Sequence, residues 1–225
     1  MIANPVARTI LCFGDSNTNG LPSNGVEYVR LAVDVRWTGR LQRKLGDGYD
    51  VIEEGLSGRT TDVDDKERPG LNGRLYFLPC VLSHHPIDVL VLMLGTNDLK
   101  SQFDRTPADI AMALSGYLDD LESIATMVEG RMPRTILVSP IHVDDSQPAY
   151  VGATAGLLDA TAVDRSRRLT DELRRLAHDR RVLFADAAAV ARAGDDGIHL
   201  SPDSHEPLAE LIAVTVKAAL SGDPP

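Results

Sequence analysis

The chain has 225 residues, of which 43% are hydrophobic, and a formal net charge of −10. A chain of this length buries roughly 70–75% of the surface that it exposes when unfolded, which suits one α/β domain over residues 1–225. The excess of acid argues against nucleic acid and membranes as partners, because both require clustered cationic surface. We therefore expect a soluble protein that acts on a small molecule.

The two cysteines, Cys12 and Cys80, imply no disulfide framework, and we expect both to be core thiols. The apolar patch before Gly14 is only about six residues long, too short for the core of a signal peptide. No run approaches the roughly 18 apolar residues of a membrane span, so the expected location is cytoplasmic.

The first third of the chain begins with an expected strand over 9–13 and a turn at Ser16, followed by an irregular loop over 21–33. Asp34 is expected to cap a helix in which Trp37, Leu41 and Leu45 recur every four residues, so Trp37 should pack in the core. A second strand is expected over 49–52.

An acidic segment over 62–68 follows, and we expect a solvated loop rim there, since it lacks the glycine and distal glutamate of a calcium loop. Residues 72–82 should be helical, with Pro79 causing a kink or a break.

The middle of the chain contains an unbroken apolar run over 88–94, typical of a central parallel strand that is covered on both faces. Thr106 and Pro107 then supply the cap and first position of a long helix. Its expected buried side comprises Ile110, Leu114, Tyr117, Leu118, Leu121, Ala125 and Val128. A fourth strand is expected over 134–138.

The last third begins with a long loop over 141–160, a length and composition typical of lids and interfaces. A helix from Val163 should carry ion pairs of Asp164 with Arg168 and of Asp171 with Arg175. A fifth strand over 182–185 and a final helix opened by 201–203 complete the series, and residues after Ser221 should fray.

Five strands that alternate with helices predict a three-layer α/β/α sandwich around a parallel sheet. The simplest arrangement is flavodoxin-like, with strand order 2-1-3-4-5, because crossovers are right-handed.

Four short motifs follow these strands or lie near the end of the chain: Gly14-Asp15-Ser16, Gly58 in a Ser-Gly-Arg-Thr-Thr segment, Gly95-Thr96-Asn97-Asp98, and Asp196-Gly197-Ile198-His199. Ligands of open parallel sheets bind at the carboxyl ends of the strands, where these motifs are expected to meet. Two of the motifs also have a simpler explanation, since Asp15 or Ser16 could cap a helix and Asn97 could form an Asx-turn.

The four motifs, in this order, resemble the SGNH (GDSL-type) hydrolase superfamily. Two longer strings look closest to its bacterial arylesterase/acyltransferase branch: 34–39 (Asp-Val-Arg-Trp-Thr-Gly) and 52–61 (Ile-Glu-Glu-Gly-Leu-Ser-Gly-Arg-Thr-Thr). The resemblance implies a serine esterase with no metal or organic cofactor, a short-chain ester as substrate and a homo-oligomeric assembly. Asn17 and Asn19 depart from that branch, in which bulkier or apolar side chains are expected beside the nucleophile.

The residues themselves permit this chemistry. A serine hydroxyl attacks an ester only when a base removes its proton, and that base needs a partner that fixes its tautomer. The spacing of Asp196 and His199 allows the carboxylate to reach Nδ1 while Nε2 faces Ser16. The resemblance further implies an oxyanion hole formed by the Ser16 N–H, the Gly58 N–H and the Asn97 amide.

Several other residues are candidates for a substrate pocket beside this centre: Asp15, Asn17, Asn19, Thr96, Asp98 and His142. The remaining histidines, His84, His85, His178 and His205, lack an aspartate at the required spacing and are interpreted as structural.

Other functions stay open at this point. Within the family, a carbohydrate O-acetyl esterase and a lysophospholipase or thioesterase are alternatives, and acyl transfer to alcohols is a further activity. A metal-dependent phosphoesterase could use Asp15, Asp62, Asp98 and His199, and it would lose activity on chelation. A binding module without catalysis would leave Ser16 unlabelled by an organophosphonate.

Overall fold

The structure, a computed structural model, describes residues 4–24, 29–125, 132–154 and 156–221. Its elements in chain order are β1 (Arg8–Gly14), α1 (Ser16–Asn19), α2 (Trp37–Leu45), β2 (Tyr49–Gly55), α3 (Gly73–Ser83), β3 (Val89–Met93), η1 (Asn97–Leu99), η2 (Ser101–Phe103), α4 (Pro107–Ile124), β4 (Arg134–Ser139), α5 (Tyr150–Thr154), α6 (Ala162–Arg180), β5 (Leu183–Asp186), η3 (Ala187–Ala189), η4 (Pro202–Ser204) and α7 (His205–Ser221).

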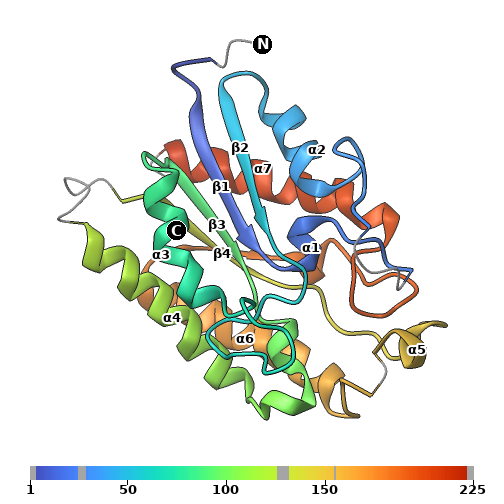
Figure 1. The fold of residues 1–225 in the computed structure, drawn as a ribbon. Helices are drawn as coiled ribbons and strands as arrows, with labels where there is room; N and C mark the ends of the chain where they lie inside the picture. The colour runs from blue at the N-terminus through green and yellow to red at the C-terminus, as the bar shows by residue number, and fades with distance from the viewer. Residues whose placement is uncertain (1–3, 25–28, 126–131, 155, 222–225) are drawn as a thin grey trace.

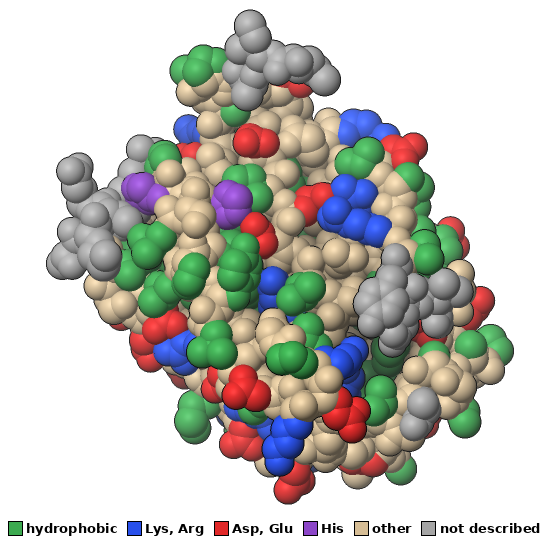
Figure 2. Space-filling model, viewed as in Figure 1, with side chains coloured by type: hydrophobic (Ala, Val, Ile, Leu, Met, Phe, Trp, Pro, Cys, Tyr) green, Lys and Arg blue, Asp and Glu red, His purple; other side chains and the backbone are tan. Residues whose placement is uncertain are grey.

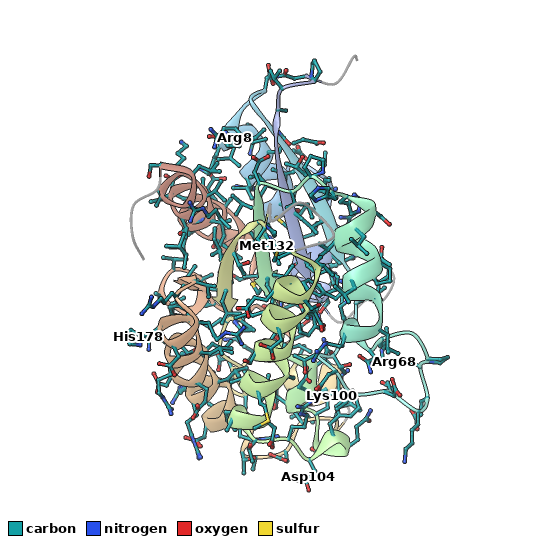
Figure 3. All side chains as sticks on the ribbon, turned by 90° about the vertical axis from the view of Figure 1, so that its left-hand side faces the viewer. Arg8, Arg68, Lys100, Asp104, Met132 and His178 are labelled. Atoms are coloured by element: carbon teal, nitrogen blue, oxygen red, sulfur yellow. The ribbon has the colours of Figure 1, made fainter. Side chains whose placement is uncertain are left out.

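The five strands form one parallel sheet in the order β2-β1-β3-β4-β5, so the predicted fold class and strand order are confirmed. Ile10 of β1 pairs with Val51 on one side and Val89 on the other. Parallel strands bring their carboxyl ends to one edge. Figure 3 shows Arg8, at the start of β1, at the opposite end of the molecule from Lys100, which follows β3.

Helices cover both faces of the sheet because its central strands are apolar on both sides. Leu11 and Phe13 point to the face that carries α3, α4 and α6, and Ile10 and Cys12 point to the face that carries α2 and α7. Figure 1 shows these two groups of helices on either side of the strands. Trp37, only 1% exposed, packs in the second core as predicted.

The start of α2 differs from the prediction, because Asp34 does not cap it. Val35 N and Arg36 N both donate to the carbonyl of Ala32, so a turn occupies this segment and the helix begins at Trp37. The first helical N–H, of Trp37, donates instead to Nδ1 of His205, 3.2 Å away at the start of α7. A buried histidine therefore caps a helix that lies far from it in sequence.

His205 makes the stability of the protein dependent on pH. Burial, together with the nearby Arg40, lowers the pKa of His205 to about 4 from an ordinary value of 6.5. Between these values the unfolded chain binds the extra proton, so stability is full above pH 6.5 and is lost as pH falls through 4. Because of His205, we expect the free energy of unfolding to fall by about 3 kcal/mol between pH 6.5 and pH 4.

The measurement is denaturant unfolding of wild type and His205→Asn at a series of pH values. Asparagine keeps an acceptor near the position of Nδ1 but does not titrate, so the difference between the two proteins should shrink as pH falls. Parallel curves from pH 7 to pH 4 would contradict this assignment.

A kink or a break was predicted at Pro79, and the break is absent, because α3 runs from Gly73 to Ser83 as one helix. Pro79 has no N–H, so the carbonyl of Leu75 loses its hydrogen bond within the helix. Leu75 is 71% exposed, so water can reach that part of the helix. The predicted start of α4 is confirmed: Thr106 and Asp109 form a capping box with Pro107 at the first position.

Two loop predictions need correction. The segment 141–160 is not wholly irregular, since α5 forms where Tyr150 packs into the core with 8% exposure. The segment 62–68 is solvated only in part, because Asp65 is 6% exposed and accepts from Glu67 N and Arg68 N. In 21–33, the described residues contain no helix or strand, as expected.

On α6 the pair Asp164–Arg168 forms at 3.2 Å, as predicted. The predicted pair of Asp171 with Arg175 is replaced by Asp171–Arg174 at 3.0 Å and Glu172–Arg175 at 2.8 Å. These pairs lie three residues apart, a spacing that brings side chains together on a helix as readily as four. The predictions for Val128 and for the residues after Ser221 lie outside the described residues. Within the described chain, no helix has the length and apolar character needed to cross a membrane.

Candidate active site

The end of β1 presents Ser16 at the edge of the sheet. Gly14 ends the strand, and Asp15 caps the short helix α1, its Oδ1 accepting from Asn17 N at 2.9 Å. Ser16 is the first residue of α1 and is 4% exposed. Burial raises the pKa of Asp15. Asp15 is thus a cap beneath Ser16, which leaves the serine hydroxyl for other partners.

The loop before α7 brings a histidine to this hydroxyl. His199 Nε2 lies 2.9 Å from Ser16 Oγ, and His199 Nδ1 lies 2.6 Å from Asp196 Oδ2. Ser16 and His199 are 183 residues apart, yet they form one continuous chain of hydrogen bonds with Asp196. Such a chain can take the proton of Ser16 as its oxygen attacks.

Asp196 also holds the backbone of its own loop. Its Oδ1 accepts from Ile198 N at 3.0 Å and from His199 N at 2.8 Å. Burial alone would raise the pKa of Asp196, but the His199 side chain and these two N–H groups outweigh it, so the pKa is lowered. Gly197 takes a φ of +75°, and a Cβ there would lie 2.3 Å from the Asp144 carbonyl oxygen, so the turn requires glycine.

The loops after β2 and β3 bring Gly58 and Asn97 together. Gly58 has a φ of +86°, and Asn97 Nδ2 donates to the carbonyl of Arg59 at 3.1 Å. An amide carries two N–H groups, so one remains for a ligand. Within the described part of the chain, neither Ser16 N nor Gly58 N donates to another backbone group. These donors have the chemistry of an oxyanion hole.

Arg59 and Asp98 fix the loop that carries Gly58. Arg59 is 3% exposed, donates from Nη1 to the carbonyls of Gly14 (2.9 Å) and Glu54, and lies over the ring of Phe13. Asp98 is fully buried and accepts from Thr61 N at 3.0 Å. Burial raises the pKa of Asp98 to about 6. Sequence alone assigns Arg59 no role, because its partners are backbone carbonyls.

Asn17 joins the Ser16 turn to the loop of His199. Its Oδ1 accepts from Leu200 N at 2.9 Å and its Nδ2 donates to Ile198 O at 3.2 Å, so one amide binds the residues on both sides of His199. Asn19, two residues later, donates instead to the carbonyl of Gly55 at 3.1 Å. Both side chains thus bind backbone.

Asn17→Leu is expected to lower kcat about tenfold and to destabilise the fold by about 1–3 kcal/mol, because two buried backbone groups beside His199 lose their partner. Steady-state kinetics and thermal unfolding measure the two effects. Asn19→Leu is the matched control, since it breaks a contact with β2 only and should change stability more than kcat. If the two variants lose kcat equally, Asn17 has no special part in placing His199.

The remaining pocket candidates lie as follows. His142 Nε2 is 3.2 Å from Thr170 Oγ1 of α6, and burial lowers the pKa of His142. Thr96 Oγ1 and Asp15 Oδ2 are buried without a hydrogen-bond partner. Of the histidines interpreted as structural, His84 pairs with Glu54 and His178 with Asp179, while His205 caps α2.

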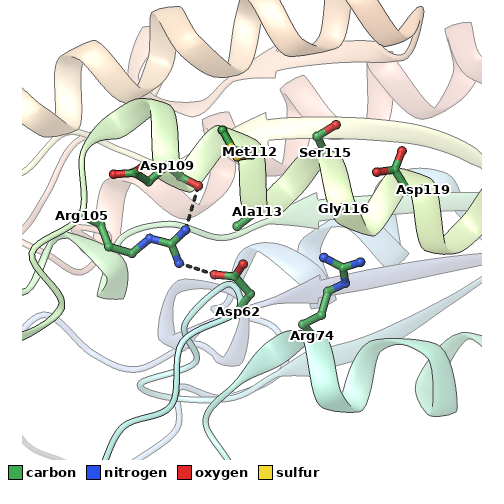
Figure 4. A pocket seen from close by; sticks show the side chains of 9 residues that line it. All are labelled: Asp62, Arg74, Arg105, Asp109, Met112, Ala113, Ser115, Gly116 and Asp119. Carbon is green, nitrogen blue, oxygen red and sulfur yellow. Dashed lines mark hydrogen bonds and ion pairs between the residues drawn. The ribbon is translucent and has the colours of Figure 1, made fainter.

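A hollow of about 370 Å³ lies away from Ser16, between α4 and the loop before α3. Figure 4 shows Arg105 joined to Asp62 and to the Asp109 carbonyl across it, with Arg74 on the far side. Arg74 is itself paired with Asp120. These cations are satisfied by protein carboxylates, so the hollow adds nothing to the hydrogen-bonded centre at Ser16.

The four candidate ligands of a phosphoesterase do not converge on one point. Asp15 caps α1, Asp62 pairs with Arg105, Asp98 binds Thr61, and His199 lies between Ser16 and Asp196. In the described ranges, none of the four belongs to a cluster with metal-binding spacing.

Comparison with known proteins decides the family. The family model of the GDSL-like lipase/acylhydrolase family matches residues 12–206, which include all four motifs. The chain belongs to this family. It is therefore an SGNH-type serine hydrolase that acts on ester bonds, as the sequence predicts. No curated protein matches the chain.

Solved structures of similar proteins cover almost the whole chain. The inhibitor-bound aryl esterase of M. smegmatis is 37% identical with a TM-score of 0.85, and the match covers 95% of this chain and 100% of that one. Est24, a carbohydrate acetylesterase from Sinorhizobium meliloti, is 36% identical with a TM-score of 0.84, covering 94% and 99%. A lipase/acylhydrolase from Enterococcus faecalis, at 20% identity and a TM-score of 0.64, shares the fold.

Proposed function

We propose that the protein hydrolyses small carboxylic esters through an acyl-enzyme on Ser16, with His199 as general base and Asp196 as the group that orients it. The observation that carries this proposal is the unbroken hydrogen-bond chain from Ser16 Oγ through His199 to Asp196 Oδ2. The partner of this site is thus a small-molecule ester.

The reaction has two balanced halves. Ser16 Oγ forms a bond to the ester carbonyl carbon as its proton passes to His199 Nε2, and the alcohol leaves with that proton as its C–O bond breaks. Water, or a second alcohol, then gives its proton to Nε2 and attacks the acyl carbon, and Ser16 Oγ leaves with the proton. Acyl transfer differs from hydrolysis only in this second nucleophile, so ester formation in added alcohol measures it.

The negative oxygen of each tetrahedral intermediate would be held by Ser16 N, Gly58 N and Asn97 Nδ2. Asn97→Ala is expected to lower kcat about 10²–10³-fold, or roughly 3–4 kcal/mol, because an oriented donor to the oxyanion is lost. Steady-state kinetics on p-nitrophenyl acetate measures it.

Asn97→Asp separates this role from packing, since aspartate keeps the size of the side chain and removes the N–H donors. It should lose as much kcat as Asn97→Ala. A kcat within a few-fold of wild type in both variants would remove Asn97 from the oxyanion hole.

The substrate class that we propose is a short-chain ester of an aryl or alkyl alcohol, with an O-acetylated carbohydrate as the second candidate. The aryl esterase and the carbohydrate acetylesterase among the similar structures support these two classes about equally. Kinetics on p-nitrophenyl esters of increasing acyl length, beside acetylated sugars, distinguishes them from a lysophospholipase or thioesterase, which would prefer long acyl chains or thioesters.

An organophosphonate tests the mechanism independently of the substrate. Mass spectrometry should find one adduct on Ser16, and a binding module would give none. Activity should also persist in excess chelator, whereas a metal-dependent phosphoesterase would lose it.

We further propose that the protein forms a homo-oligomer. On α3, Leu75 and Leu82 are 71% and 40% exposed, and Figure 2 shows hydrophobic side chains gathered over this helix. Apolar surface of this kind supports association with a second copy. Light scattering after gel filtration tests it, and a monomer at micromolar concentration would contradict it.

A further inference from the structure

A second cluster of reactive side chains lies outside the Ser16 site, between the edge strand β2 and α3. It consists of Glu54, Cys80 and His84, and a carboxylate oxygen, the sulfur and a ring nitrogen all lie within 4.8 Å of one another. Cys80 lies in the last turn of α3, and His84, four residues later, is the residue that ends this helix. Glu54 comes from the adjacent strand.

Hydrogen bonds to Glu54 join β2 to the side chains of α3 and of the residue that follows it. His84 Nε2 lies 2.8 Å from Glu54 Oε1, and the hydroxyl of Tyr76 donates to Glu54 Oε2 at 3.3 Å. Cys80 is 1% exposed, whereas the side chains of His84 and Glu54 are 29% and 20% exposed. The cluster is therefore closed on the core side and open to solvent on the other.

We infer that Glu54, Cys80 and His84 form a binding site for Zn²⁺ or a similar transition-metal ion. Thiolate, imidazole and carboxylate are the three ligand types that Zn²⁺ takes in proteins, whereas Ca²⁺ and Mg²⁺ select oxygen alone. Bond lengths of about 2.0–2.3 Å place tetrahedral ligand atoms about 3.3–3.8 Å apart. The three atoms are thus within small rotamer changes of a zinc geometry, with water as the fourth ligand.

Cys80 must lose its proton before its sulfur can bind a metal ion. Burial, with a smaller effect of Glu54, raises the pKa of Cys80 to about 12, so the thiol of the metal-free protein keeps its proton and is inert. A bound metal ion displaces that proton. Tyr76, bonded to the second oxygen of Glu54, would then orient the carboxylate from outside the coordination shell.

The site would join two elements that support the catalytic loop. The Glu54 carbonyl accepts from Arg59, and the carbonyl of Arg59 in turn accepts from Asn97. A metal ion held by β2 and α3 should therefore stabilise the fold. At a free Zn²⁺ concentration 100 times its dissociation constant, we expect a rise in Tm of about 5–10 °C.

Titration of the reduced, chelator-treated protein with Co²⁺ tests the site directly, because a cobalt–thiolate bond gives a charge-transfer band in the near ultraviolet. One equivalent should bind and be displaced by Zn²⁺. Cys80→Ser should lose the band, and Glu54→Gln or His84→Gln should weaken binding more than about 100-fold. Tyr76→Phe should weaken it about 10–100-fold, as expected for a partner outside the shell.

Two variants are matched controls. His85→Gln removes the histidine next to His84, and Cys12→Ala removes the other buried cysteine. Both should leave the band intact. Thermal unfolding without metal tests whether each variant folds. Should Cys80→Ser unfold, the variants at the partly exposed positions 54 and 84 still test the site. The inference fails if wild type shows no thiolate band, if the band survives in Cys80→Ser, or if His84→Gln and His85→Gln bind alike.

Discussion

Replacing Ser16 by alanine is expected to lower kcat for ester hydrolysis about 10⁶-fold, because the only nucleophile of the proposed mechanism is lost. His199 lies 2.9 Å from the Ser16 hydroxyl, so the two act as a unit. His199→Ala should cost about as much as Ser16→Ala, and the double variant little more than either. Steady-state kinetics on p-nitrophenyl acetate, with enzyme concentration fixed by absorbance, measures all three.

Ser57→Ala is the control for this series, since Ser57 lies just before Gly58 at the same edge of the sheet, and it should keep kcat close to wild type. Thermal unfolding should show that Ser16→Ala folds normally. A Ser16→Ala protein that kept more than a hundredth of wild-type kcat would contradict the acyl-enzyme mechanism. Additive losses in the double variant would show that Ser16 and His199 act separately.

The sheet was predictable because its signal is local. The apolar residues of 89–94 are followed by a glycine and those of 136–138 by a serine, and right-handed crossovers leave few possible strand orders. Parallel strands then bring Ser16, Gly58 and Asn97 to one edge. The contact between Asp196 and His199 was predictable for the same reason, because the two residues lie within a single turn of the chain.

Contacts between distant segments could not be predicted in this way. His205 caps α2 from 168 residues away, and Asn17 binds the backbone beside His199 from the other end of the chain. In each case the decisive partner is a backbone N–H, which every residue except proline carries, so the sequence holds no signal of it. Glu54 meets Cys80 and His84 only because β2 and α3 pack together.

Local patterns also mislead where the surroundings outweigh them. Pro79 should interrupt a helix in isolation, yet α3 continues through it. Asp34 has the chemistry of a cap, but it lies inside a turn that begins at Ala32, and the helix begins only at Trp37. A proline inside a helix, or a helix start without a side-chain cap, costs about 1–3 kcal/mol of stability. Burial of the apolar face of a helix stabilises the fold by more than this.

Asp196→Asn is expected to lower kcat about 10⁴-fold while the fold stays intact. The reason lies in the two oxygens of Asp196. Oδ1 accepts from Ile198 N and His199 N, and an asparagine must keep its carbonyl oxygen there to satisfy those donors. Its NH₂ group then faces Nδ1 of His199, which can only accept. The ring must therefore carry its proton on Nε2, and Nε2 can no longer take the proton of Ser16.

Asp196→Ala gives the contrasting result, because it removes the acceptor as well as the charge. Its two freed N–H groups should lower the unfolding free energy by about 1–3 kcal/mol each, so this variant should lose Tm, whereas Asp196→Asn should unfold near the wild-type temperature. Kinetics and calorimetry on the same preparations test both claims. If Asp196→Asn keeps kcat within tenfold of wild type, the carboxylate does not set the tautomer of His199, and the hydrogen bond between them serves only to hold the loop.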